Sequence, residues 1–317
     1  MVTLLLTCYV PEVLSWGFWA HKRINRMAVF TMPPDLIGFY KSHIDYITEN
    51  AVNPDKRRYA VPDEAARHYI DIDHYGEHPF DSVPRNWKDA VAKYSEDTLK
   101  AYGIVPWHIL IMKYRLTEAF QKKDLSRILF LSADIGHYLG DAHVPLHCTK
   151  NYNGQLTNQK GIHGFWESRI PELYGEDYDC LVGTAEYIED PLDYIWKIIE
   201  GSANAVDSVL DFERELNTEF PTDRKYAIEN RGSVTMQVYS RDYCIAYNTK
   251  LDGMIERRYR QSIKAIGSFW YTCWVDAGQP DVSDLKKYEM TAEEKEKEKE
   301  LDQIWKTGKA PEKGHSD

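Results

Sequence analysis

Cysteine is scarce in this chain: there are five among 317 residues, and none stands in a Cys-x-x-Cys pair. Their spacing argues against a thiolate zinc site and against a dithiol redox motif. Loss of the leader described below would remove Cys8 and leave Cys148, Cys180, Cys244 and Cys273. An even number permits disulfides in an exported protein, but it establishes neither their presence nor their pairing.

Positive charge is also in short supply, because 39 Lys and Arg face 50 Asp and Glu, which gives a formal net charge of −11. Such a protein does not attract nucleic acid or an anionic membrane through its overall field, so we expect no stable nucleic-acid complex. A phosphate-bearing ligand would need a local positive centre, such as a metal cluster. Nothing in the sequence implies an obligate protein partner.

Long apolar runs are absent, and the run from Leu4 to Val10 is too short to span a membrane, so no transmembrane segment is expected. Residues 1–15 are typical of a short secretory signal peptide, and cleavage after Ser15 would make Trp16 the first mature residue. This predicts a secreted or periplasmic protein. The stretch has no Lys or Arg before its apolar run, so a cytosolic leader stays open as the alternative.

Helical periodicity dominates the rest of the chain, and no stretch alternates apolar and polar residues well enough to predict a sheet. We expect one all-α domain over residues 16–290, followed by a charged tail over 291–317 that is an exposed helix or disordered. The expected helices cover residues 20–32, 34–51, 87–102, 106–122, 124–143, a segment from 163, 190–201, 202–216, 232–247 and 252–274.

The densest cluster of potential metal ligands lies between Asp134 and Glu167. His137 and Asp141 are four residues apart, and so are His163 and Glu167, which places each pair on one face of a helix. An imidazole nitrogen and a carboxylate oxygen are both good zinc ligands, and His147 lies between the two pairs. The window therefore predicts a metal site rather than a set of structural histidines.

Further ligands are expected from the N-terminal part of the chain, where Asp55 and His68 flank a connection between helices. His21 follows Trp16 by five residues, so a newly exposed Trp16 amine and carbonyl could chelate a metal together with the His21 imidazole. This third site depends on cleavage before Trp16. Arg58 is expected to be a solvated loop residue.

Five stretches between residues 16 and 167 match the motifs of a known superfamily. They are W-G-F-W-A-H, P-D-K-R-R, R-H-Y-I-D, H-Y-L-G-D-A-H-V-P-L-H and G-I-H-G-F-W-E. Together they resemble the superfamily that joins bacterial zinc-dependent phospholipases C to the zinc-dependent single-strand nucleases of fungi and plants. The resemblance implies a single multi-helix all-α domain that binds three zinc ions.

Carried over residue by residue, the resemblance implies three ligand sets. The first ion would be held by Asp55, His68, His137 and Asp141, with Asp63 as a rival to Asp55. The second would be held by His147, His163 and Glu167. The third would be held by the Trp16 amine and carbonyl, His21 and Asp141, so that Asp141 bridges two ions.

The implied reaction is hydrolysis of a phosphodiester. A water that bridges two zinc ions loses a proton near neutral pH, and the resulting hydroxide attacks phosphorus. Asp55 or Asp71 could steer or deprotonate this water, and Asp55 is our preferred candidate. Tyr69 could stack on a base, line a lipid head-group pocket or pack in the core.

Two substrates fit this pattern. Glu167, where the nucleases usually have Asp, and the short loop from His147 to His163 favour a phospholipase C. The short spacing from Trp16 to His21 and the stretch R-H-Y-I-D favour a single-strand-specific endonuclease. We prefer the phospholipase C, with the nuclease as the alternative and a non-catalytic zinc-binding protein as a third hypothesis.

Overall fold

The computed structural model describes residues 17–231, 234–285, 288–307 and 315. The expected signal peptide and Trp16 lie outside the described residues. Within them the chain is mostly helical, with one two-stranded sheet, so the predicted all-α class is confirmed. No helix of the described part is long and apolar enough to cross a membrane.

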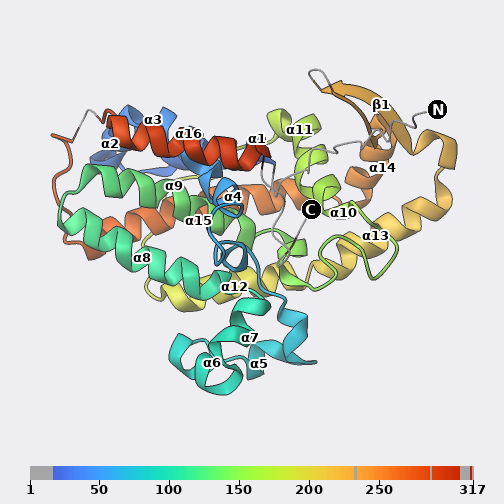
Figure 1. Ribbon diagram of the computed structural model, residues 1–317, viewed down its shortest axis with the longest axis horizontal. Helices are drawn as coiled ribbons and strands as arrows, with labels where there is room; N and C mark the ends of the chain where they lie inside the picture. Colours follow the sequence, from blue (N-terminus) through green and yellow to red (C-terminus); the bar gives the residue numbers. More distant parts are fainter. Residues whose placement is uncertain (1–16, 232–233, 286–287, 308–314, 316–317) are drawn as a thin grey trace, which may run out of the picture.

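Four helices form the centre of the molecule: α1 (Phe18–Ala28), α8 (Val105–Gln121), α9 (Leu125–Ala142) and α15 (Met254–Asp276). α9 packs against the other three, and α15 also packs against α1 and α8 (Figure 1). Large aromatic side chains fill the space between them, as their abundance leads one to expect. Tyr40 stacks on Trp270 with ring centroids 4.6 Å apart, and the Trp270 indole donates a hydrogen bond to the Ser132 carbonyl.

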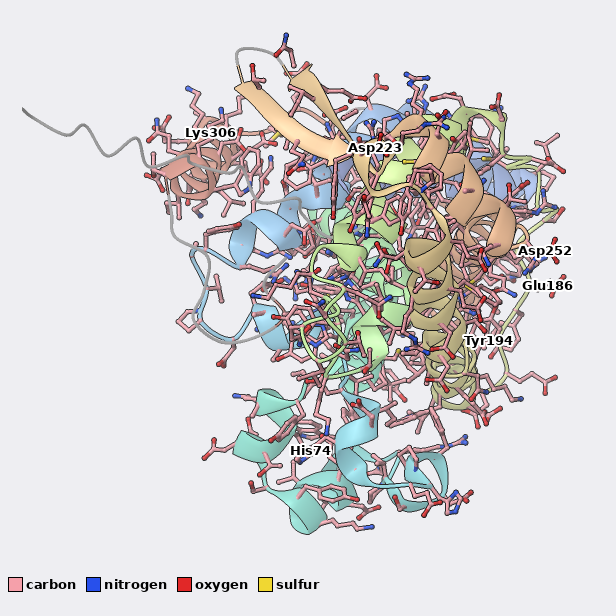
Figure 2. All side chains as sticks on the ribbon, turned by 90° about the vertical axis from the view of Figure 1, so that its right-hand side faces the viewer. His74, Glu186, Tyr194, Asp223, Asp252 and Lys306 are labelled. Atoms are coloured by element: carbon pink, nitrogen blue, oxygen red, sulfur yellow. The ribbon has the colours of Figure 1, made fainter. Side chains whose placement is uncertain are left out.

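The remaining α-helices surround this centre and are mostly short. They are α2 (Pro34–Ser42), α3 (Ile44–Glu49), α4 (Asn53–Arg57), α5 (Pro79–Ser82), α6 (Trp87–Tyr94), α7 (Glu96–Ala101), α10 (Ile162–Gly164), α11 (Ile170–Tyr174), α12 (Pro191–Ala203), α13 (Val206–Glu219), α14 (Arg241–Lys250) and α16 (Ala292–Thr307). The single helix expected over 87–102 is two helices, because Ser95 has a φ of 70° and its side chain caps α7. α5, α6 and α7 form a lobe at the bottom of Figure 1, and Figure 2 places His74 in this lobe.

The expectation of no sheet is wrong at residues 226–239, where β1 (Tyr226–Arg231) pairs antiparallel with β2 (Val234–Tyr239). A helix had been expected from residue 232, but α14 begins only at Arg241. Contacts that the local sequence does not reveal fix the hairpin to the body. Tyr239 stacks on Phe165 at 3.9 Å, and the Arg169 guanidinium holds the Glu229 carboxylate at 2.6 and 2.9 Å.

α16 runs along the outside of the bundle, across α4 (Figure 1), and none of its residues is buried. Figure 2 shows Lys306, near the end of this helix, on the opposite side of the molecule from Tyr194 and Glu186. The expectation of an exposed tail fails at one described residue. His315 is only 4% exposed, because it lies among aromatic side chains of the body.

Candidate metal centre

Four segments that are distant in sequence bring the first set of predicted ligands together. α9 supplies His137 and Asp141 one turn apart, α1 supplies His21, α4 supplies Asp55, and His68 follows a short 3₁₀ turn over Ala65–Arg67. All five side chains are buried. Their elements meet at the middle of the bundle, where water is largely excluded.

Two glycines on α9 allow α1 to approach this closely. A Cβ at Gly140 would lie 3.1 Å from both Cε1 and Nδ1 of the His21 ring, and a Cβ at Gly136 would overlap the Asn25 side chain. Protein interiors are packed too tightly to absorb such atoms without a shift. Gly140 therefore helps to set the distance between His21 and Asp141.

Asp141 is the centre of the first group. Its Oδ2 lies 2.9 Å from His68 Nδ1 and 3.2 Å from His137 Nε2, and its Oδ1 lies 3.3 Å from His21 Nε2. Asp55 completes the group, with Oδ1 3.5 Å from His137 Nε2 and 3.7 Å from His68 Nδ1. One carboxylate thus faces imidazoles on two sides, which is the geometry of a bridging ligand.

The second group contains His147, His163 and Glu167, all of them buried. Glu167 Oε2 lies 3.0 Å from His163 Nε2 and 3.5 Å from His147 Nε2. The predicted pair His163 and Glu167 spans α10 and a π-helical turn over Phe165–Arg169. π-Helical turns are rare in proteins, and those that occur are often at functional sites. The candidate ligand atoms of this group all lie within 4.8 Å of one another, as do those of His68, His137 and Asp141 and those of His21, Asp55 and His137.

Backbone carbonyls fix the orientation of two of these rings. His137 Nδ1 donates to the Ala51 carbonyl at 2.9 Å, and His147 Nδ1 donates to the His68 carbonyl at 2.6 Å. In both cases Nε2 points to the neighbouring ligands. Metal-binding histidines are usually held in this way. The bond between His147 and the His68 backbone also ties the two groups together.

Protonation states in the first group fit a metal. Burial is the main reason that the pKa of His21 falls to about 4 and that of His68 to about 3. Both rings are therefore neutral at pH 7, which is the form that binds a metal. Burial also lowers the pKa of His137, but the Asp141 and Asp55 carboxylates outweigh it and raise the value to about 9. His137 would release a proton on binding a metal.

The second group fits a metal for a different reason. Burial raises the pKa of Glu167, but His163 and His147 outweigh it and lower the value to about 2, so this fully buried carboxylate is ionised. Neither of its oxygens has a hydrogen bond of good geometry within the described part of the chain. Its Oε2 instead faces His163 Nε2 and His147 Nε2, so a zinc ion between these side chains would have one carboxylate and two imidazoles as ligands.

No model of a known protein family matches the sequence, and no curated protein matches it either. The interpretation of this centre therefore rests on its geometry and on the motifs that the sequence itself contains.

The structure separates the two candidates for the first carboxylate. Asp55 is completely buried beside His68 and His137, whereas Asp63 is exposed and pairs with Lys100 at 3.2 Å. Asp71 joins neither ligand group. It is buried, and its Oδ1 accepts a hydrogen bond from His315 Nε2 at 2.6 Å. Mainly because of burial, the pKa of Asp71 rises to about 7.

An aromatic slot adjoins the second group. Tyr69 and Tyr152 lie on the two faces of the His315 ring, with centroid distances of 3.8 and 4.0 Å and interplanar angles of 17° and 11°. The His147 and His163 rings are 6.1 and 6.5 Å from the same ring. We call the space between Tyr69 and Tyr152, with Asp71 at its edge, the tyrosine slot.

Sequence reasoning missed Tyr152 and His315, and it was wrong about Arg58. Arg58 is buried, and its guanidinium donates a hydrogen bond to the His315 carbonyl. Glu64 was missed as well. It is fully buried, accepts hydrogen bonds from Tyr138 and Arg67, and lies 3.9 Å from His68 Nε2. Its position four residues before His68 was the available signal.

Proposed function

We propose that this protein is a zinc-dependent phosphodiesterase. The observation that carries the proposal is the meeting of two buried ligand groups, one centred on Asp141 and one on Glu167, through the hydrogen bond from His147 to the His68 carbonyl. Zinc ions bound there would supply the positive charge that a phosphodiester needs and would lower the pKa of a bound water to roughly 7.

Three ions fit the set of donors. His68, His137, Asp141 and Asp55 would hold the first, and His147, His163 and Glu167 the second. His21 faces Asp141 at 3.3 Å and would hold the third, together with the proposed Trp16 amine and carbonyl. This third set rests on removal of the leader before Trp16, and with it on export. Amino-terminal sequencing of the purified protein tests both, because any other first residue removes the chelating amine.

The protein's own groups have distinct tasks in this proposal. The neutral His21 and His68 would coordinate zinc through a ring nitrogen. The two oxygens of Asp141 would each coordinate a different ion of the first group. Asp55 remains our candidate for steering the attacking water, because it lies among the ligands. Asp71 faces the tyrosine slot, so we assign it to substrate recognition instead.

The tyrosine slot favours the nuclease as the second, more specific candidate. The two rings enclose a flat heteroaromatic ring in parallel, and Asp71 accepts a hydrogen bond from that ring's edge. A nucleobase offers the same flat face and N–H edge, and stacking on an aromatic side chain contributes about 1–3 kcal/mol per base. A choline head group would instead bind by cation–π contact. The sequence motifs favour the phospholipase C, whereas the tyrosine slot favours the nuclease.

The test of the proposal combines metal analysis with hydrolysis of bis-p-nitrophenyl phosphate. We expect bound zinc and turnover in the unmodified protein. Asp141→Ala should lose turnover and the ions that Asp141 binds, and keep the ion held by His147, His163 and Glu167. Asp63→Ala is the matched control, because this carboxylate is exposed and outside the ligand groups. Bound zinc without hydrolysis would support the non-catalytic zinc-binding hypothesis instead.

A second assay separates the two substrates. Release of phosphocholine from phosphatidylcholine without cleavage of single-stranded DNA would support the phospholipase C, and the reverse result would support the nuclease. Tyr152→Ala should weaken only the reaction whose substrate occupies the slot.

A further inference from the structure

His315, close to the C-terminus, lies against the candidate active site. His315 lies 244 residues from Asp71 in the sequence, yet its Nε2 donates to the Asp71 carboxylate at 2.6 Å. Both faces of its ring are covered, by Tyr69 and by Tyr152. The side chain therefore fills the tyrosine slot.

The main chain of the same residue is held too. The Arg58 guanidinium donates to the His315 carbonyl, and Arg58 is itself buried. Two ring faces, one ring nitrogen and one carbonyl of a single residue thus have partners in the body. His315 is therefore surrounded by the body in the way that a bound ligand is, and not exposed as a surface residue is.

α16 ends at Thr307, eight residues before His315, and contacts the body through side chains that are not buried. Lys56 pairs with Asp302 at 2.6 Å, Glu294 accepts a hydrogen bond from Ser126, and Trp305 packs on Phe18 at 5.0 Å. None of the residues of α16 is buried, and a partly exposed ion pair contributes about 1 kcal/mol or less. The contacts of α16 with the body are therefore individually weak.

We propose that His315 is an intramolecular competitive inhibitor, which occupies the tyrosine slot and must be displaced by a substrate. Tethering favours occupancy, because a short linker gives an effective concentration in the millimolar range. The competition with substrate rests on the proposed function, whereas the contact between His315 and the slot does not.

Kinetics of the full-length chain test the competition. We expect His315→Ala to lower KM for a single-stranded oligonucleotide, or for phosphatidylcholine if that is the substrate, about tenfold with kcat unchanged. His78→Ala is the matched control, because His78 is exposed and lies outside the site. His315→Phe keeps the stacking but loses the bond to Asp71, so its KM should lie between that of the unmodified protein and that of His315→Ala. Equal KM values for all of these proteins would overturn the proposal.

A binding measurement separates the contact from catalysis. A synthetic peptide with the sequence of residues 308–317 should bind to the His315→Ala protein in calorimetry, and the same peptide with Ala in place of His315 should not. Peptide binding without any hydrolysis would support occupancy of the slot by His315 and refute the phosphodiesterase. Hydrolysis without peptide binding would support the phosphodiesterase and refute inhibition by His315.

Discussion

Glu64 shows how a residue outside the ligand set can support the centre. Its carboxylate is fully buried between Arg57, Arg67, Tyr138 and His68. Loss of such a supporting carboxylate typically weakens metal binding about 10–100-fold. We expect Glu64→Gln to lower zinc affinity by that amount in a competitive chelator titration. An unchanged affinity would mean that Glu64 serves only the ion pairs with arginine.

The raised pKa of His137 predicts a pH dependence of stability in the metal-free protein. The folded value of about 9 lies above the usual 6.5. The charged ring therefore stabilises the fold fully below about pH 6.5, and this contribution disappears as the pH rises through 9. Its size is on the order of 3 kcal/mol. Denaturant unfolding at pH 6.5 and 9 in the presence of a chelator measures it. Zinc-loaded protein should not show the loss, because coordination requires the neutral ring.

The ligand candidates were predictable because their chemistry and spacing are visible in the sequence. His137 and Asp141 are one helical turn apart, and so are the ends of the pair formed by His163 and Glu167. Tyr152 and His315 were not predictable, because neither has a spacing relation to Tyr69 and stacking is a tertiary contact. The preference for Asp55 over Asp63 also needed the structure, which buries one and exposes the other.

At the scale of single elements, α9 divides its faces between core and site. Asp134, His137, Tyr138 and Asp141 follow at helical spacing along one side, and Asp134 pairs with Arg57 at 2.6 Å. Ile135 and Leu139 belong to the hydrophobic core. A continuous polar stripe on a buried helix needs partners along its whole length. Here α1, α4 and the segment around His68 supply them.

The close approach of α1 to α9 gives a prediction for Gly140. Gly140→Ala would bring a methyl group to 3.1 Å from the His21 ring, so His21 must shift by a few tenths of an ångström. We expect weaker binding of the zinc ion shared by His21 and Asp141, measured as a lower third equivalent in metal analysis. Gly38→Ala in α2 is the control, because a Cβ there meets nothing within 4 Å. It should raise stability by roughly 0.5–1 kcal/mol and leave zinc content unchanged.

Long helices were predicted well and the hairpin was not, for one physical reason. Helical periodicity repeats over many residues in α8, α9 and α15, so its signal is strong. Each strand of the hairpin has six residues and is tied to the body by Phe165 and Arg169. Those tertiary contacts, and not local propensity, decide its structure.

At the scale of the whole molecule, the all-α class followed from periodicity, but the assembly did not. The expected segments had to be brought together around α9, and their ligands supplied the only clue to that arrangement. The position of α16 was also unforeseen, because a charge run with no buried residue gives no information about what it lies against. Its contacts with Lys56 and Phe18 place it against α4 and α1.

The four described cysteines show that disulfides do not stabilise this part of the molecule. The sequence left disulfides open, but Cys148, Cys180, Cys244 and Cys273 are all buried free thiols. Burial is the main cause that raises the pKa of Cys148 and Cys273 to about 12, and a buried protonated thiol is unreactive. A reductant should therefore leave the unfolding temperature of the protein unchanged. A thiol reagent should react at these four positions only after denaturation, which mass spectrometry of the modified peptides can show. A drop in unfolding temperature on reduction would mean that covalent links, and not the bundle and its proposed metal centre, hold the fold together.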